Sequence, residues 1–198
     1  MKIYDISQEL FGCVVFPGDP APVRQTLSSM EEGALYNLTA LSLCAHNGTH
    51  IDAPYHFIKD GKTVDKVPLS KTVGWAYVAQ EEGMLSAKDA HRILADAQMA
   101  HPEAAKRILV GGKVTITEEA ARVFAEANID LLGNESQTVG PEDAPMQVHL
   151  ILLSREVVLL EGIRLGGVPM GVYLLSAAPI SLAGSDGAPC RAILISFE

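Results

Sequence analysis

Three histidines and one aspartate lie within eleven consecutive positions of the chain, in the stretch HNGTHIDAPYH. They are His46, His50, Asp52 and His56, and they include half of the six histidines in the sequence. Imidazole nitrogens and carboxylate oxygens bind Zn²⁺, Mn²⁺ and Fe²⁺ in sites that keep open coordination positions. An ion in such a site can lower the pKa of a bound water to about 7 and so produce hydroxide. A nearby histidine that is not needed as a ligand can carry protons.

The backbone conformation of this stretch decides whether its side chains can meet at one ion. A helix would place His46 and His50 one turn apart, which is a known metal-binding spacing. However, Gly48 costs roughly 1 kcal/mol within a helix, and Pro54 would break the following turn. A straight strand would separate the two histidines by about 13 Å, at roughly 3.3 Å per residue, which is too far for one ion.

A strand that bends at residues 47–48, Asn-Gly, satisfies both constraints, because glycine allows unusual backbone angles. Beyond the bend, His50 and Asp52 are two positions apart and therefore point to the same side of the strand. The Ala-Pro pair at 53–54 then turns the chain, so that His56 can point back toward the site. His56 is either a further ligand or a proton shuttle. We favour the shuttle because three ligands precede it and water and substrate need open positions.

The rest of the chain predicts a mixture of strands and helices that must hold this cluster. Strands are expected at 2–7, 36–46, 73–80, 129–133, 156–162 and 188–196, and helices at 85–98, 117–128 and 145–156. Ser86 with Asp89 forms a capping box at the first helix, and Thr117 caps the second. The stretch 36–46 has little polarity on either face, so we expect it in the centre of a sheet. The fold class is therefore α/β or mixed α+β.

Length and charge restrict the class of protein. The 198 residues suit one domain, 1–198, and no apolar run approaches the roughly 18 residues of a membrane span. The net charge of −9, without a basic cluster, argues against nucleic acids and anionic membranes as partners. The first ten residues lack the apolar region of a signal peptide, and Cys13, Cys44 and Cys190 form no CxxC pair. We therefore expect a cytoplasmic protein.

The segment HNGTHIDAPYHF resembles the HxGTHxDxPxH motif of the cyclase family of metal-dependent hydrolases, which includes bacterial kynurenine formamidase and isatin hydrolase. Further similar segments follow the family's order: YDISQEL and FPGDP near the start, VTITEEAARVFAEANIDLLG in the middle, and LLEGIRLGGVPMGVYLLSAAPISLAGSDGAPCRA at the end. The resemblance thus covers nearly the whole chain. It implies a homodimer with a mixed, β-barrel-like sheet core flanked by helices, of the swivelling β/β/α type.

The resemblance also implies roles for individual residues. His46, His50 and Asp52 match the ligands of a first metal ion, and His56 matches the catalytic histidine. A second ion would share Asp52 and use His149 and Glu161. The loop GNESQTVG departs from the family's usual sequence and is expected to frame the substrate pocket through four residues, which are Asn134, Glu135, Ser136 and Gln137.

Together these observations predict a hydrolase of a C–N bond in a small amide that depends on one or two divalent ions per chain. Zinc is the favoured metal and manganese the alternative. The resemblance implies an arylformamidase that converts N-formylkynurenine to kynurenine and formate in tryptophan catabolism. One alternative is a ring-opening hydrolase that acts on a cyclic amide or lactone. Another is a metal-binding protein without catalysis, in which four protein ligands would close the site.

Overall fold

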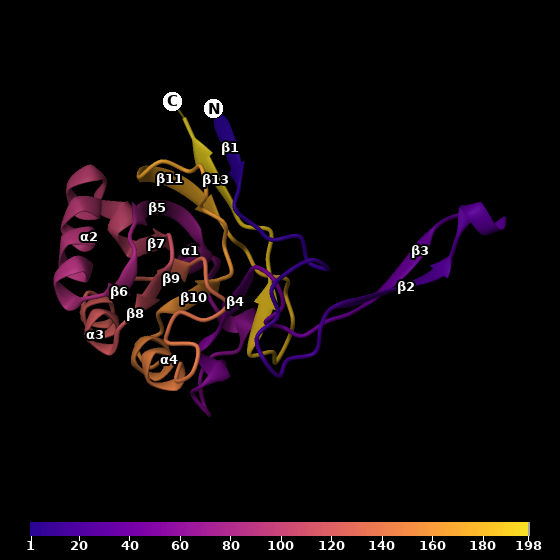
Figure 1. Cartoon of the computed structure of the whole chain (residues 1–198), viewed down its shortest axis with the longest axis horizontal. Coiled ribbons are helices and arrows are strands. Elements are labelled where there is room, and N and C mark those ends of the chain that lie inside the picture. The colour runs from indigo at the N-terminus through magenta and orange to yellow at the C-terminus, as the bar shows by residue number, and fades with distance from the viewer. Residues whose placement is uncertain (198) are drawn as a thin grey trace.

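The computed structural model describes residues 1–197, and within them a curled, mixed nine-stranded sheet forms the centre of the molecule (Figure 1). Its spatial order is β1 (Lys2–Asp5), β13 (Ile193–Ser196), β11 (Gly171–Ser176), β5 (Val73–Gln80), β7 (Arg107–Gly111), β9 (Leu131–Asn134), β10 (Val158–Glu161), β4 (His50–Asp52) and β12 (Gly187–Pro189). The strands from β5 to β10 run parallel, and the strands outside them pair antiparallel. The expected mixed sheet flanked by helices is confirmed.

Helices cover one face of this sheet (Figure 1). They are α2 (Ala87–Ala100), α3 (Glu118–Glu126) and α4 (Met146–Leu153), which correspond to the predicted helices. Ser86 and Asp89 form the expected capping box, and the side chain of Thr117 accepts a hydrogen bond from the backbone N–H of Ala120. Both signals are local, because a cap depends only on residues three positions apart.

The central strands are buried on both of their faces. Along β7 and β10, successive side chains enter alternate cores: Ile108 and Leu159 pack beneath the helices, whereas Leu109 and Leu160 pack on the other face. Their near-continuous apolar sequence is typical of parallel strands between two layers. Residues of both strands are therefore buried where β10 meets β4, the strand that carries His50.

The expectation of a central strand at 36–46 is wrong. Residues Leu38–Ser42 form β3, whose one partner among the described strands is β2 (Val23–Ser28), and the two strands make a hairpin arm that stands out from the body (Figure 1). The arm ends in a short 3₁₀ turn, Met30–Glu32. Its apolar residues are exposed, as Leu35 is to 93%. An apolar sequence predicts that a strand is covered, but it does not say by which surface.

Shorter elements complete the fold. The predicted strand 188–196 is two strands, β12 and β13, and the strands β2, β6 (Gly83–Leu85), β7, β8 (Val114–Ile116) and β11 were not predicted. A small parallel pair joins β6 to β8. Single helical turns occupy Pro54–His56, Val64–Lys66, α1 (Leu69–Thr72) and Pro102–Lys106. No helix in the described part of the chain is long and apolar enough to cross a membrane.

Candidate metal centre

The bend predicted at residues 47–48 is present and begins the site. Gly48 adopts a φ of 67°, in the left-handed region that favours glycine. The chain then enters β4, whose residues 50 and 52 point to one side. The 3₁₀ turn Pro54–His56 follows and brings the His56 ring to 3.9 Å from the Asp52 carboxylate, measured from Nε2 to Oδ2. Local sequence alone thus gathers most of the cluster.

Two neighbouring elements add a carboxylate and an imidazole. Glu161 ends β10 directly opposite His50 in the antiparallel pair, so the two side chains share a face. His149 projects from the middle of α4, and its Nε2 lies 3.2 Å from Glu161 Oε1 and 3.6 Å from Asp52 Oδ2. His50 Nε2 in turn lies 3.4 Å from Glu161 Oε2. The structure therefore brings together all six residues that were expected at the metals and in catalysis.

Backbone carbonyls fix the orientation of two of these rings. The Nδ1 of His50 lies 3.1 Å from the carbonyl oxygen of Gly48, and the Nδ1 of His149 lies 2.9 Å from that of Pro145. Because a carbonyl only accepts, each Nδ1 carries a hydrogen and each Nε2 faces the carboxylates. Such contacts to backbone carbonyls set the tautomer of metal-ligating histidines in proteins.

The carboxylate of Asp52 lies at the middle of the cluster and is fully buried. Its Oδ1 is 2.8 Å from His46 Nδ1 and 3.3 Å from His50 Nε2, whereas its Oδ2 faces His149 and His56. Burial alone would raise the pKa of Asp52, but the imidazoles of His149, His46 and His50, which approach its carboxylate closely, hold that pKa well below its usual range. One oxygen of Asp52 is thus available to each group of histidines.

Two buried carboxylates, those of Asp52 and Glu161, lie close together in the cluster. Positive charge is needed beside them, either on protonated imidazoles or on a cation. Desolvation lowers the pKa of both His50 and His149, but contacts with Asp52 and Glu161 outweigh it and raise each pKa to about 10. For His46, desolvation is again outweighed by Asp52, and its pKa rises to about 9. In the described structure the buried His50 Nε2 and Asp52 Oδ2 have no hydrogen-bond partner. A divalent cation fits this donor set, since histidine and carboxylate are the ligands that zinc and manganese accept.

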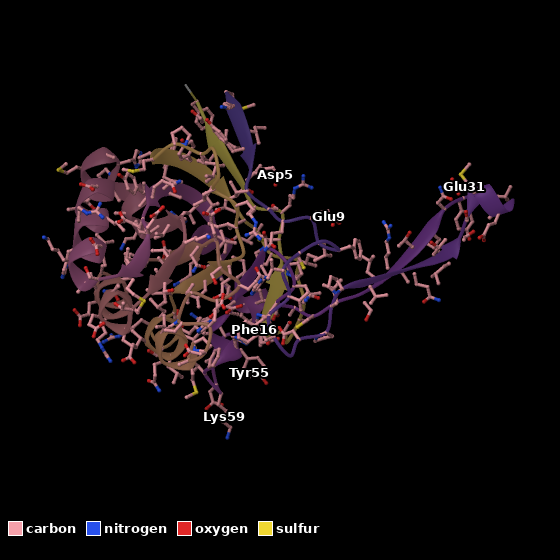
Figure 2. All side chains as sticks on the ribbon, in the orientation of Figure 1. Asp5, Glu9, Phe16, Glu31, Tyr55 and Lys59 are labelled. Atoms are coloured by element: carbon pink, nitrogen blue, oxygen red, sulfur yellow. The ribbon has the colours of Figure 1, made fainter. Side chains whose placement is uncertain are left out.

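A cavity of about 210 Å³ opens above the cluster. Its lining combines the site histidines with other residues, which are Phe16, Asp19, Phe57, Gln137, Thr138, Pro145 and Glu161. Phe57 stacks against His149, with ring centroids 4.7 Å apart. Phe16 belongs to the loop that follows β1, and Figure 2 shows it where this loop lies against the body, far from Glu31 at the tip of the arm. A cavity of this size, with two phenyl rings, suits a small aromatic molecule.

Of the four residues expected in the substrate pocket, one lines the cavity and the other three make hydrogen bonds to the backbone of nearby loops. Gln137 lines the cavity. Asn134 is buried and donates a hydrogen bond to the carbonyl of residue 138, and Ser136 Oγ accepts one from the backbone N–H of that residue. Glu135 accepts hydrogen bonds from the backbone N–H groups of Gly112 and Leu165. The loop 134–137 is thus held mainly by its own side chains, and Gln137 is the one of the four that lines the cavity.

Asp186 is a further residue at the site, and it was not singled out from the sequence. Its Oδ2 lies 2.8 Å from His46 Nε2 and 3.3 Å from His56 Nδ1. The position is 140 residues from His46, so no local spacing links the two. One signal was available: between residues 162 and 197, Asp186 is the only carboxylate in the sequence.

Comparisons with known proteins find relatives along nearly the whole chain. A model of the family described as putative cyclase matches residues 4–111. A kynurenine formamidase from Salinibacter ruber is 32% identical, and the match covers 98% of this chain and 97% of the relative. One from Erythrobacter litoralis is 30% identical, over 98% and 93%.

Solved structures share the fold over nearly the whole length. A structure described as a potential metal-dependent hydrolase with cyclase activity superposes with a TM-score of 0.80 at 27% identity, covering 98% of this chain and 96% of that one. An isatin hydrolase from Labrenzia aggregata gives a TM-score of 0.79 at 22% identity, covering 100% and 94%. With the family model matching more than half of its residues and relatives matching nearly all of it, the chain belongs to the cyclase family.

Proposed function

We propose that the protein is a metal-dependent hydrolase that cleaves the C–N bond of a small amide, with the N-aryl formamide N-formylkynurenine as the leading substrate. The observation that carries the proposal is the buried set of His50, His149, Asp52 and Glu161, joined by the partly buried His46, beside a small aromatic-walled cavity. Relatives of nearly full length that are kynurenine formamidases support the same reaction.

Two overlapping groups of residues would hold the metal. His46, His50 and Asp52 form the first, and Asp52 with His149 and Glu161 forms the second. Asp52 presents one oxygen to each group, which supports up to two ions that share it. We favour zinc, with manganese as the alternative, because both accept nitrogen and oxygen ligands together. When bound, the ion supplies Lewis-acid chemistry and lowers the pKa of a coordinated water to about 7.

His56 would move the proton. Burial lowers the pKa of this histidine below its ordinary value, so the ring is neutral at neutral pH and can accept a proton. It lies at the cavity wall, with its side chain 27% exposed, and can reach both water and substrate. In this scheme His56 takes a proton from the attacking water as the C–O bond forms. It then gives the proton to the leaving nitrogen as the C–N bond breaks, so that the products are a carboxylic acid and an amine.

The cavity walls would select the substrate. Phe16 and Phe57 offer apolar surface for an aryl group, and Gln137 and Thr138 offer hydrogen-bonding groups for its substituents. A ring-opening reaction on a cyclic amide or lactone needs the same machinery, and the likeness of the fold to isatin hydrolases makes it the second candidate.

The test compares turnover and metal content on one preparation. We expect zinc- or manganese-loaded protein to hydrolyse aryl formamides faster than isatin, cyclic imides or lactones, and to bind one or two ions per chain. Preference for a cyclic substrate would establish the second candidate. A chelator should abolish activity while circular dichroism keeps the folded spectrum. Loss of the fold on chelation, without turnover of any substrate by loaded protein, would identify a structural metal site and contradict the proposal.

We also propose that the domain, residues 1–198, works as a homodimer in the cytoplasm. The hairpin arm supports dimerisation, because a two-stranded hairpin is marginally stable alone and this one exposes Val23, Leu27, Met30, Leu35, Leu38 and Leu41. A second copy of the chain would cover these side chains. The three cysteines, which form no disulfide in the described part of the chain, support a reducing compartment.

A further inference from the structure

We infer that Asp186 is a positioning residue that sets the tautomers of His46 and His56 together, through one carboxylate oxygen. Oδ2 of Asp186 lies within hydrogen-bond distance of Nε2 of His46, at 2.8 Å, and of Nδ1 of His56, at 3.3 Å. The two rings lie against each other, with centroids 4.1 Å apart and planes tilted by 32°. The inference rests on the proposed function for its catalytic consequence, but its geometry stands without it.

The chemistry follows from the acceptor. An ionised carboxylate only accepts hydrogen bonds, so the nitrogen of each ring that faces Asp186 carries the hydrogen. In this structure Nδ1 of His46 also faces a carboxylate oxygen, that of Asp52 at 2.8 Å, so by the same rule both nitrogens of the ring carry a hydrogen. Asp186 retains the hydrogen on Nε2, which makes Nδ1 the nitrogen that gives up its hydrogen and offers a lone pair when an ion binds. His56 has its lone pair on Nε2, which is the nitrogen turned toward Asp52 and the centre of the site. Oδ2 of Asp186 thus leaves Nδ1 of His46 for an ion and Nε2 of His56 for a proton, and both nitrogens face Asp52.

The backbone holds Asp186 firmly although its side chain is 42% exposed. Its carbonyl accepts a hydrogen bond from the backbone N–H of Ala53 at 2.9 Å, and the next residue, Gly187, pairs with Asp52 in the sheet. Gly187 also leaves room for the ring of His46, because a Cβ there would lie 2.9 Å from His46 Cε1. The carboxylate is therefore tied to the strand that carries the metal ligands.

The other two imidazoles of the site are oriented in a different way. His50 and His149 direct their Nδ1 hydrogens to backbone carbonyls, which a side-chain substitution cannot remove. His46 and His56 depend on Asp186 instead. Outer carboxylates of this kind typically change metal affinity or activity by about 10–100-fold when they are removed.

The test uses zinc-loaded protein labelled with ¹⁵N in histidine. Two-bond ¹H–¹⁵N correlation spectra distinguish an Nδ1–H ring from an Nε2–H ring, and the signal of His56 is assigned by its loss in His56→Ala. We expect the Nδ1–H form in the unaltered protein and loss of that preference in Asp186→Ala. Asp186→Asn, which keeps a carbonyl oxygen at the same position, should retain it in part. An Nε2–H ring in the unaltered protein, or a ring unaffected by Asp186→Ala, overturns the inference.

Kinetics and metal content complete the design. Asp186→Ala should lower kcat by about 10–100-fold with KM changed less than about threefold, and should weaken zinc affinity through His46. At saturating zinc in a His56→Ala background, the same change should lower kcat by less than about threefold, because the residue through which it acts is gone. Equal losses in both backgrounds overturn the inference.

Ser185→Ala is the matched control for loop structure. Its hydroxyl contacts Asp186 Oδ1 and the carbonyl of Gly187 but neither histidine, so it should leave tautomer and kcat unchanged. A Ser185→Ala enzyme as impaired as Asp186→Ala would show that only loop structure matters and would overturn the inference. Loss of a whole zinc equivalent in Asp186→Ala would make Asp186 a ligand, which also overturns it. If unaltered enzyme hydrolyses no tested substrate, the proposed function fails, while the tautomer and zinc measurements still decide the role of Asp186.

Discussion

Replacing Asp52 by asparagine keeps the size of the side chain and removes one buried negative charge from the centre of the cluster. Both carboxylate oxygens are in use, since Oδ1 faces His46 and His50 and Oδ2 faces His149. The residue has no solvent exposure, so water cannot take over the lost contacts. Asp52→Asn should therefore weaken every ion at the site rather than one of two.

The size of the effect follows from Coulomb's law. A unit charge about 4 Å from another is worth about 4 kcal/mol at an effective dielectric constant of 20, which corresponds to roughly a thousandfold in affinity. A divalent ion at ligand distance interacts more strongly than this reference pair. We therefore expect Asp52→Asn to weaken zinc binding by about 10³-fold or more.

The assay is competition with a chromophoric chelator at constant pH, combined with elemental analysis after gel filtration. Asp19→Asn is the matched control, because Asp19 is a carboxylate that lines the same cavity outside the cluster. We expect its zinc affinity to stay within about threefold of the unaltered protein. Zinc binding by Asp52→Asn within tenfold of the unaltered protein would refute the central role given to this carboxylate.

Three further predictions concern His56, the pH dependence of zinc binding, and the hairpin arm. His56→Ala should keep its metal and its fold while kcat falls by about 10²–10⁴-fold. His50→Ala should instead lose the metal. A metal-free His56→Ala protein would show that His56 is a ligand. Zinc affinity should rise about tenfold or more per pH unit between pH 6 and 8. The pKa values of His50 and His149 are raised to about 10 each, so protons must leave these rings before the ion binds. A zinc affinity that does not change with pH in titration calorimetry would contradict the assigned ligands. The double variant Leu27→Asp, Leu41→Asp places charges on two exposed leucines of the arm and should convert a dimer to a monomer while the body stays folded. Light scattering measures the mass. A mass near 21 kDa for the unaltered protein would exclude the dimer.

The parts of the fold and site that could be predicted depend on residues close together in the chain. The bend at Gly48, the shared side of His50 and Asp52, and the capping box at Ser86 are all decided within a few positions. Local sterics and hydrogen bonding act over this range, so a single sequence contains the information. His149 and Glu161 were found only through resemblance to a family, because their meeting depends on how α4 and β10 pack beside β4.

The parts that could not be predicted depend on pairing between distant segments. Asp186 reaches His46 only because β12 pairs with β4, and no spacing within the sequence encodes that register. The stretch 36–46 was assigned to the core because its side chains are largely apolar, but the strand Leu38–Ser42 lies in the arm with most of its side chains exposed. Apolar patterning alone does not distinguish the two positions. Glu135 shows the same limit, since its binding to two backbone N–H groups depends on where two other loops lie.

The order of strands in the sheet has a consequence for how the protein is made. The strand with His50 and Asp52 is synthesised early, but it lies between β10 and β12, which leave the ribosome much later. Among the described strands, β1 likewise pairs with β13, which is far from it in the sequence. The histidines at 46 and 50 are therefore made well before Glu161. The residues proposed to hold an ion come together only after β10, which carries Glu161, has been made and has paired with β4.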